Sequence, residues 1–282
     1  SSRGLGDVYK RQDIGRKHNI PLIMDNTASP VICKPLDHGA AVVVHSLTKF
    51  IGGHGTVIGG CLVDGGNFDW TADPKRQPLF NEPDASYGGA VWGEVVPQLT
   101  GANVAFAVRA RVCLLRDLGA PLAPDNAWGI IQGLETAPLR MKQHCSNAEK
   151  VVDFLTKHKS VTRVIYPTLH KGTVGDRAKK YFKGGNGALV GIEVKGGVEA
   201  GKKFIEALKM FYHVANIGDA RSLAIHPATT THSQLTEEEL LAAGVTPGYV
   251  RLSIGIEHPD DIIADLKQAL DASGKPGLKA VS

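Results

Sequence analysis

An acidic residue and a lysine each follow a short apolar run in the first fifty residues. Asp25 ends the run Pro21–Asp25, and Lys49 comes shortly after the run Ala41–His45, in the segment HSLTKFIGGHGTVIGG. Both runs lack polar alternation, which is typical of parallel strands covered on both faces. Open α/β sheets bind ligands at the carboxyl ends of their strands, so the carboxylate and the amine are expected at one rim.

Hydroxyl residues and glycines surround the lysine. Ser46 and Thr48 precede it, and a glycine-rich stretch begins at Gly52. The glycines do not form a P-loop, because no Lys-Ser or Lys-Thr pair follows them. They lead into an expected strand rather than a helix, unlike a dinucleotide-binding fingerprint. Since glycine lets the backbone approach a ligand closely, we expect this loop to border one.

These side chains together suit a phosphate-bearing aldehyde cofactor. Lysine can form a Schiff base, hydroxyls can bind phosphate, and a carboxylate can keep a pyridinium nitrogen protonated, which is the pattern of pyridoxal phosphate. The spacing alone leaves a second interpretation open, in which Lys49 is a surface lysine and Asp25 caps a helix.

The elements around this rim indicate an α/β fold. A third strand is predicted at Gly59–Val63, and the valines and leucine between 104 and 115 predict a helix that ends at Gly119. Pro138 is predicted to open a long helix with an apolar stripe reaching Leu155. We expect residues 13–140 to be the C-terminal part of a large domain with a parallel-rich sheet.

Residues 141–282 show a different pattern, typical of a smaller α+β domain. Its predicted strands are Val161–Tyr166, Ala188–Val194, Phe211–Ala215 and Tyr249–Ile254. Its predicted helices are Val198–Leu208, one capped by Thr236 and Glu239, and Pro259–Ala272.

Composition excludes several classes of protein. The chain has 282 residues with 32 Lys and Arg against 28 Asp and Glu, a net charge of +4, and 43% hydrophobic residues. The basic stretch RAKKYFK at 177–183 is better explained as a solvated helix face than as a nucleic-acid site. No apolar run could span a bilayer, and the four cysteines lack a framework pattern. We therefore expect a cytoplasmic protein with neither nucleic-acid nor membrane partners.

The beginning of the chain has no initiator Met, and its first twelve residues, SSRGLGDVYKRQ, are polar. The sequence then continues directly into an expected helix end and a buried strand, which is an unusual start for a domain. We expect the chain to be a fragment, with residues 1–12 a non-native or disordered leader.

Three segments resemble a known family. DNT at 25–27, HSLTKFIGGHGTVIGG at 45–60 and YVRLSIGIEHPDDIIADLKQAL at 249–270 resemble the Cys/Met-metabolism family of pyridoxal-phosphate enzymes, and the similarity extends from about Asp13 to Leu270. The resemblance implies the aspartate-aminotransferase type I fold. Within the family, GGHGT-x-IGG looks like the branch that acts on O-acetylhomoserine.

The resemblance also implies roles for individual residues. Lys49 matches the Schiff-base lysine and Asp25 the partner of the pyridine nitrogen. Ser46 and Thr48 match positions whose hydroxyls bind the cofactor phosphate.

Two further residues match substrate-binding positions. Arg251 lies on the polar face of its expected strand, and its guanidinium fork suits the substrate α-carboxylate. Ser222 matches a position whose backbone contacts the same carboxylate.

The activity implied is γ-replacement on O-acetyl-L-homoserine by sulfide or a small thiol, giving homocysteine or methionine and acetate, in a homo-oligomer. Methionine γ-lyase or cystathionine γ-synthase activity remains an alternative, as does a non-catalytic fragment. Family members carry upstream of Asp25 a phosphate-binding loop, an aromatic residue that stacks on the cofactor and a Tyr-x-Arg pair, and none of these can be assigned here.

Overall fold

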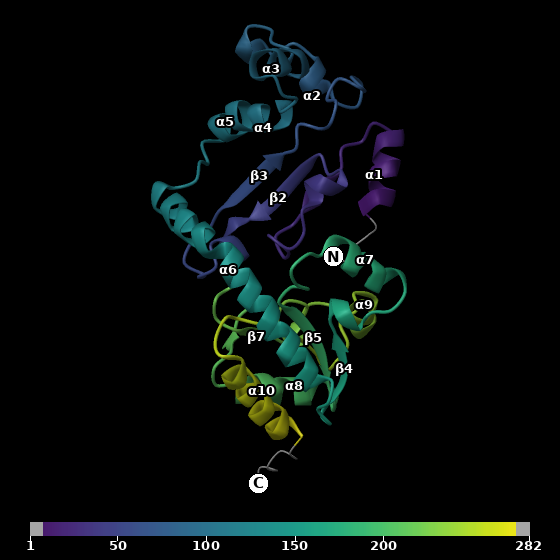
Figure 1. Ribbon diagram of the computed structural model, residues 1–282, viewed down its shortest axis with the longest axis vertical. Helices are drawn as coiled ribbons and strands as arrows, with labels where there is room; N and C mark the ends of the chain where they lie inside the picture. The colour runs from purple at the N-terminus through teal and green to yellow at the C-terminus, as the bar shows by residue number, and fades with distance from the viewer. Residues whose placement is uncertain (1–7, 275–282) are drawn as a thin grey trace.

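A computed structural model describes residues 8–274, which form an elongated molecule around two sheets (Figure 1). The strands are β1 Ile23–Asp25, β2 Val42–Ser46, β3 Gly60–Asp64, β4 Val161–Ile165, β5 Leu189–Val194, β6 Tyr212–His213, β7 Leu223–Ile225 and β8 Tyr249–Ser253. The α-helices are α1 Val8–Lys17, α2 Pro78–Asn81, α3 Trp92–Thr100, α4 Ala105–Arg109, α5 Arg116–Leu118, α6 Pro124–Leu155, α7 Thr173–Tyr181, α8 Gly197–Ala207, α9 Glu237–Ala242 and α10 Pro259–Ser273.

The first sheet has the order β1-β2-β3 and lies in the upper part of Figure 1. Strands β1 and β2 are parallel, as the sequence predicted, and the structure pairs Asp25 with Val44. Strand β3 is antiparallel to β2, with Ser46 paired to Gly60. Residues 47–59 connect the two strands, and they carry the lysine turn and the glycine-rich loop.

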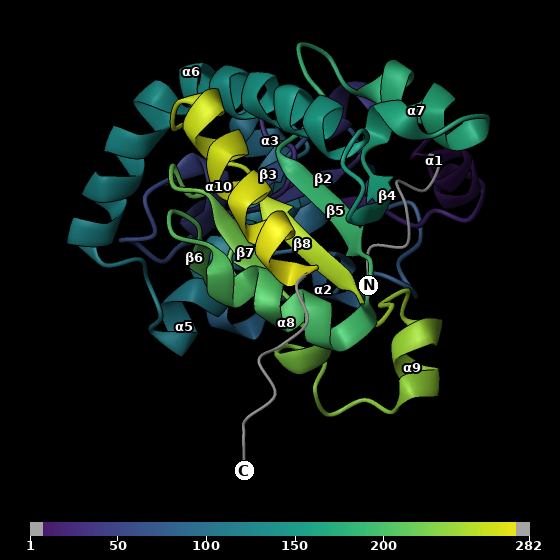
Figure 2. The ribbon, with the colours of Figure 1, turned by 90° about the horizontal axis from the view of Figure 1, so that it is seen from below.

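The second sheet has the order β4-β5-β8-β7-β6. Its neighbours are antiparallel except β6 and β7, which are parallel. Figure 2 shows α8 and α10 lying across this sheet, with α6 beside them. The largest hydrophobic core lies between these helices and strands, and its fully buried members include Leu155, Ile192, Phe204, Leu252 and Leu266.

Helix α6 connects the two parts of the molecule (Figure 1). It begins at Pro124 and continues through Pro138 to Leu155, so the prediction that Pro138 opens the helix was wrong. Proline at the first turn loses no helical hydrogen bond, which suits Pro124, whereas Pro138 gives up one interior bond. Contacts of α6 with the lysine turn, β5 and α10 hold the helix together across that position.

Other elements differ from prediction in detail. The predicted helix over 104–115 is present as α4, a π-helical stretch Ala110–Leu115 and α5, and it ends at Gly119 with the left-handed conformation expected of a C-cap. The capping box of Thr236 and Glu239 is also confirmed.

The short strand β7 was not predicted, and α1 begins at Val8, inside the stretch expected to be a leader. Residues 1–7 of that stretch lie outside the described part of the chain. None of the helices between residues 8 and 274 combines the length and apolarity needed to cross a bilayer.

Candidate active site

Lys49 lies in a π-helical turn, Leu47–Ile51, directly after β2. Arg140 of α6, which is 6% exposed, holds this turn in place. The Arg140 guanidinium donates hydrogen bonds to the carbonyl oxygens of Phe50 (2.7 Å) and Ile51 (2.8 Å). Burial lowers the pKa of Arg140, and these carbonyl dipoles offset part of the cost of keeping its charge inside.

The glycines after Lys49 serve internal packing. A Cβ on Gly53 would lie 2.0 Å from Arg140 Nη1, and a Cβ on Gly55 would lie 2.6 Å from Asp219 Oδ2. Both glycines also have positive φ, which disfavours other residues. These two glycines therefore admit two charged side chains of the protein itself. The expectation that the loop borders a ligand stays a prediction.

The rim after β1 and β2 carries the acid and the hydroxyls. Asp25 is exposed, and its Oδ1 accepts a hydrogen bond from the N–H of Thr27 (2.9 Å). Thr27 Oγ1 accepts from the N–H of Ser46 (2.8 Å), which ties the ends of the two strands together. Thr48 Oγ1 accepts from the N–H of Gly59 (3.1 Å). The structure thus places Asp25, Ser46 and Thr48 around the turn that carries Lys49.

The side chain of Lys49 reaches the second part of the molecule. Its Nζ donates a short hydrogen bond to Oδ1 of Asn216, 167 residues away in the sequence. The main-chain carbonyl of Asn216 accepts a hydrogen bond from Arg251 Nη2 (3.1 Å). One residue therefore joins the predicted nucleophilic amine to the predicted carboxylate-binding guanidinium.

Arg251 has the properties of an anion-binding group. It lies on β8 opposite Ile225 of β7, and burial lowers its pKa. Among the described residues, its buried Nε has no hydrogen-bond partner. A buried donor without an acceptor costs free energy, and a carboxylate bound at the guanidinium fork would remove that cost.

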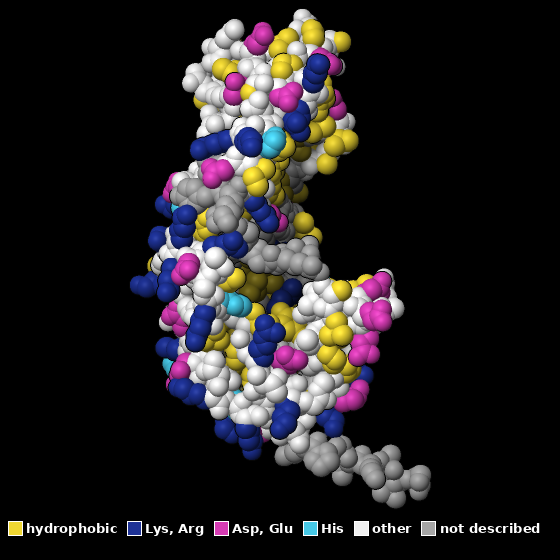
Figure 3. Space-filling view, turned by 90° about the vertical axis from the view of Figure 1, so that its right-hand side faces the viewer, with side chains coloured by type: hydrophobic (Ala, Val, Ile, Leu, Met, Phe, Trp, Pro, Cys, Tyr) yellow, Lys and Arg dark blue, Asp and Glu magenta, His cyan; other side chains and the backbone are white. Residues whose placement is uncertain are grey.

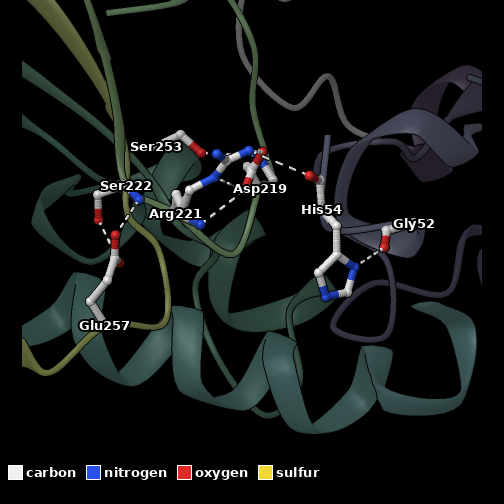
Figure 4. A network of polar contacts seen from close by, with 8 residues as sticks. Gly52, His54, Asp219, Arg221, Ser222, Ser253 and Glu257 are labelled. Atoms are coloured by element: carbon white, nitrogen blue, oxygen red, sulfur yellow. Dashed lines mark hydrogen bonds and ion pairs between the residues drawn. The ribbon is translucent and has the colours of Figure 1, made fainter. Parts of the chain in front are cut away.

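Ser222 has different partners from those expected. Its N–H donates to Glu257 Oε1 (2.6 Å) and its hydroxyl to Glu257 Oε2 (2.9 Å), as Figure 4 shows. Glu257 thus holds the N–H of Ser222 in this arrangement, and the contact of this backbone group with a substrate carboxylate stays a prediction. Asn216, which has no motif in the sequence, stands beside Arg251 instead.

The segment that carries Asn216 is bound to the lysine loop. The N–H of Ala220 donates to the Gly53 carbonyl (2.8 Å), and the N–H of Gly218 donates to Ser253 Oγ of β8 (3.0 Å). Asp219, which is 5% exposed, pairs with Arg221 (3.2 Å), and Arg221 in turn reaches the His54 carbonyl (3.5 Å; Figure 4). These contacts fix the second sheet against the lysine turn.

The donor set suits pyridoxal phosphate. A lysine amine, a carboxylate on the neighbouring strand end and two hydroxyl residues share one rim, and an orphaned guanidinium donor lies across from them. Lys49 would hold the aldehyde carbon, Asp25 the ring nitrogen, and Ser46 with Thr48 the phosphate.

Comparison with known proteins identifies the class. The model of the family described as Cys/Met metabolism PLP-dependent enzyme matches residues 4–271, so the chain belongs to this family. The resemblance seen in the sequence is confirmed, and the match begins inside the stretch expected to be a leader.

Two of the similar proteins carry names that specify a reaction within the family. The chain is 52% identical over 269 residues to an O-acetyl-L-homoserine sulfhydrylase of Leptospira meyeri, a match that covers 94% of this chain and 60% of the relative. It is 45% identical to a homocysteine synthase of Schizosaccharomyces pombe, covering 95% of this chain and 62% of that protein. The chain thus spans about 60% of the length of these relatives.

A solved structure confirms the fold. The crystal structure of a putative O-acetylhomoserine (thiol)-lyase from Campylobacter jejuni superimposes with a TM-score of 0.85 at 43% identity, covering 95% of this chain and 63% of that one. That protein carries N'-pyridoxyl-lysine-5'-monophosphate. The predicted fold and the predicted cofactor of the family are therefore confirmed.

Proposed function

We propose that this chain supplies the lysine and the carboxylate-binding group of an enzyme that converts O-acetyl-L-homoserine and sulfide, or a small thiol, into homocysteine or methionine and acetate. Relatives named for this substrate and product support the reaction. The single observation that carries the proposal is the contact chain in which Lys49 Nζ and Arg251 Nη2 bind the same residue, Asn216.

Arg251 binds and orients the substrate. Its fork holds the α-carboxylate, and its buried Nε gains the acceptor that it lacks among the described residues. Asn216 keeps this guanidinium within reach of Lys49, so the substrate Cα is placed next to the amine.

Lys49 moves the protons. Bound pyridoxal phosphate supplies an electron-accepting ring next to the substrate Cα. The Lys49 amine takes the proton from Cα and moves a proton at Cβ. Acetate then leaves Cγ, and the sulfur nucleophile takes its place, so one C–O bond breaks and one C–S bond forms.

The test uses a protein in which this chain is joined to the upstream part of the Leptospira meyeri relative. The protein is assayed in whatever homo-oligomer it forms. Acetate release and homocysteine formation are measured with O-acetyl-L-homoserine and sulfide. We expect both products in equal amounts, and none without sulfide. Release of acetate with no sulfur product would reject the replacement reaction.

Two alternative activities use the same site. Cysteine as nucleophile giving cystathionine would indicate a cystathionine γ-synthase, and methionine breakdown without added thiol would indicate a γ-lyase. A protein that is folded but shows no pyridoxyl group on Lys49 after borohydride treatment would be a non-catalytic fragment.

A further inference from the structure

Asn216 contacts two groups of the site through different atoms. Its side-chain Oδ1 accepts from Lys49 Nζ, whereas its main-chain oxygen accepts from Arg251 Nη2 at 3.1 Å. A charged lysine ammonium has three donors and no acceptor, so the amide oxygen of Asn216, and not its nitrogen, faces Lys49 in this form.

The position of Asn216 is fixed by its neighbours in the chain. Gly218 packs so closely on Phe50, the residue after Lys49, that a Cβ there would lie 2.6 Å from the Phe50 backbone nitrogen. The N–H of Gly218 is bound to Ser253 Oγ, and that of Ala220 to Gly53. The segment is therefore attached to the lysine turn and to β8, and Asn216 projects from it toward the amine.

We propose that Asn216 is a positioning residue that holds the Lys49 amine through its side-chain amide and the Arg251 guanidinium through its carbonyl. The amide restrains an otherwise flexible lysine chain at the rim, within reach of the group that the lysine must attack. The carbonyl sets the distance from that amine to the guanidinium.

The two contacts can be separated experimentally. Asn216→Ala removes the side-chain acceptor of Lys49 and keeps the carbonyl that binds Arg251, so only the lysine loses its partner. Asn216→Asp keeps an acceptor oxygen of the same reach and is the conservative variant. Val214→Ala, two residues away at a position 45% exposed, is the matched control.

The first measurement uses the 282-residue chain without cofactor. Lysines are methylated briefly with formaldehyde and cyanoborohydride, and Lys49 is quantified by peptide mass spectrometry against Lys157, whose side chain is 72% exposed. Losing one hydrogen bond should raise the labelling rate of Lys49 about two- to tenfold in Asn216→Ala. Val214→Ala should leave that rate near that of the unaltered chain. Asn216→Asp should not raise it, because the carboxylate still accepts from the amine and favours the unreactive ammonium form.

The inference deepens the proposed function but is tested independently of it, because methylation needs neither cofactor nor turnover. Unchanged labelling of Lys49 in a folded Asn216→Ala protein would overturn it, and so would equal acceleration in Val214→Ala. If Asn216→Ala does not fold, Asn216→Ser, whose hydroxyl is too short to reach Lys49, replaces it with the same expected result.

A second measurement links positioning to the reaction. In the protein joined to the relative's upstream part, Asn216→Ala should lower kcat at least about tenfold and leave the KM for O-acetyl-L-homoserine within about twofold, because Arg251 keeps its carbonyl partner. A raised KM with unchanged kcat would show that Asn216 serves substrate binding instead. Absence of activity in every variant, with altered labelling in Asn216→Ala, would reject the proposed function alone.

Discussion

The guanidinium of Arg140 occupies the space that any side chain at Gly53 would need. A Cβ built on Gly53 would lie 2.0 Å from Nη1 of Arg140, well inside contact distance. The same guanidinium binds the carbonyl oxygens of Phe50 and Gly133. The loop that follows the lysine is thus shaped around an arginine of α6.

Replacing Arg140 by leucine should destabilise the protein. The change leaves the carbonyls of Phe50, Ile51 and Gly133 without this donor, and each unsatisfied buried group costs about 1–3 kcal/mol. Urea unfolding should show a loss on the order of 3 kcal/mol or more. The control is Arg76→Leu, which removes only an exposed ion pair with Asp73 and should change stability by less than about 1 kcal/mol.

Lys49→Ala should abolish turnover rather than weaken cofactor binding alone. One residue is proposed both to bind the cofactor and to move protons, and general acid–base catalysis contributes about 10²–10⁴-fold. The measurement is sulfide-dependent homocysteine formation in the protein joined to the relative's upstream part, with the exposed Lys75→Ala as control. A Lys49→Ala enzyme with more than about a tenth of normal turnover would exclude this role.

Arg251→Leu should raise the KM for O-acetyl-L-homoserine and leave borohydride-trapped pyridoxyl on Lys49 unchanged. Truncating one partner of a buried charged pair costs about 2–5 kcal/mol, so KM should rise at least about 30-fold. Arg163→Leu, at an exposed position on β4, is the matched control. Loss of the pyridoxyl group with an intact fold would place Arg251 at the cofactor.

His144 should make stability depend on pH. It is fully buried, its Nδ1–H donates to the Ile254 carbonyl (2.7 Å), and burial lowers its pKa to about 4 from an ordinary 6.5. Arg140 lowers this pKa further, and Asp219 opposes that effect.

The unfolded chain therefore binds a proton at His144 below about pH 6.5, whereas the folded chain stays neutral until about pH 4. The stabilisation is complete above pH 6.5 and should fall by on the order of 3 kcal/mol as the pH drops to 4. Unfolding at pH 7 and 4.5 measures this loss. His144→Gln should reduce it, and the exposed His170→Gln should not.

The chain expressed alone should be either poorly soluble or both free of cofactor and inactive. Strand β1 has β2 as its partner and forms an edge of its sheet, with Ile23 48% exposed. A groove lined by Leu62, Leu114 and Leu118 is open beside β3, and Figure 3 shows apolar side chains among the charged ones on one face of the molecule. Exposed apolar edges favour aggregation.

Joining the upstream part of the Leptospira meyeri relative should restore solubility and pyridoxyl trapping together. The comparison is expression yield, absorbance and homocysteine formation for the two proteins. A soluble, yellow and active 282-residue chain would contradict the expectation.

The sequence predicted the elements that have strong local signals. Short apolar runs located β1 and β2, and the capping box of Thr236 and Glu239 located α9. The start of α6 was missed because Gly129 and Gly133 weaken its helical pattern. Gly133 is needed for packing, since a Cβ there would lie 2.4 Å from the Gly52 carbonyl oxygen.

The candidate site was predicted where its residues form contiguous motifs. Asp25, Ser46, Thr48 and Lys49 lie at one rim because they follow adjacent strands. Asn216 could not be found in this way, because its partner Lys49 is 167 residues distant and only the packing of the two sheets brings them together.

Because α6 is one continuous helix from Pro124 to Leu155, it fixes the rotation of one sheet relative to the other. Gly133 and Arg140 face the lysine turn, while Ala148 and Leu155 enter the core of the second sheet. Each residue inserted between these sites would turn one end by about 100° relative to the other and lengthen the helix by about 1.5 Å. The number of residues between these sites therefore sets the orientation of Arg251 relative to Lys49. We expect insertions or deletions there to be tolerated only if they restore that orientation.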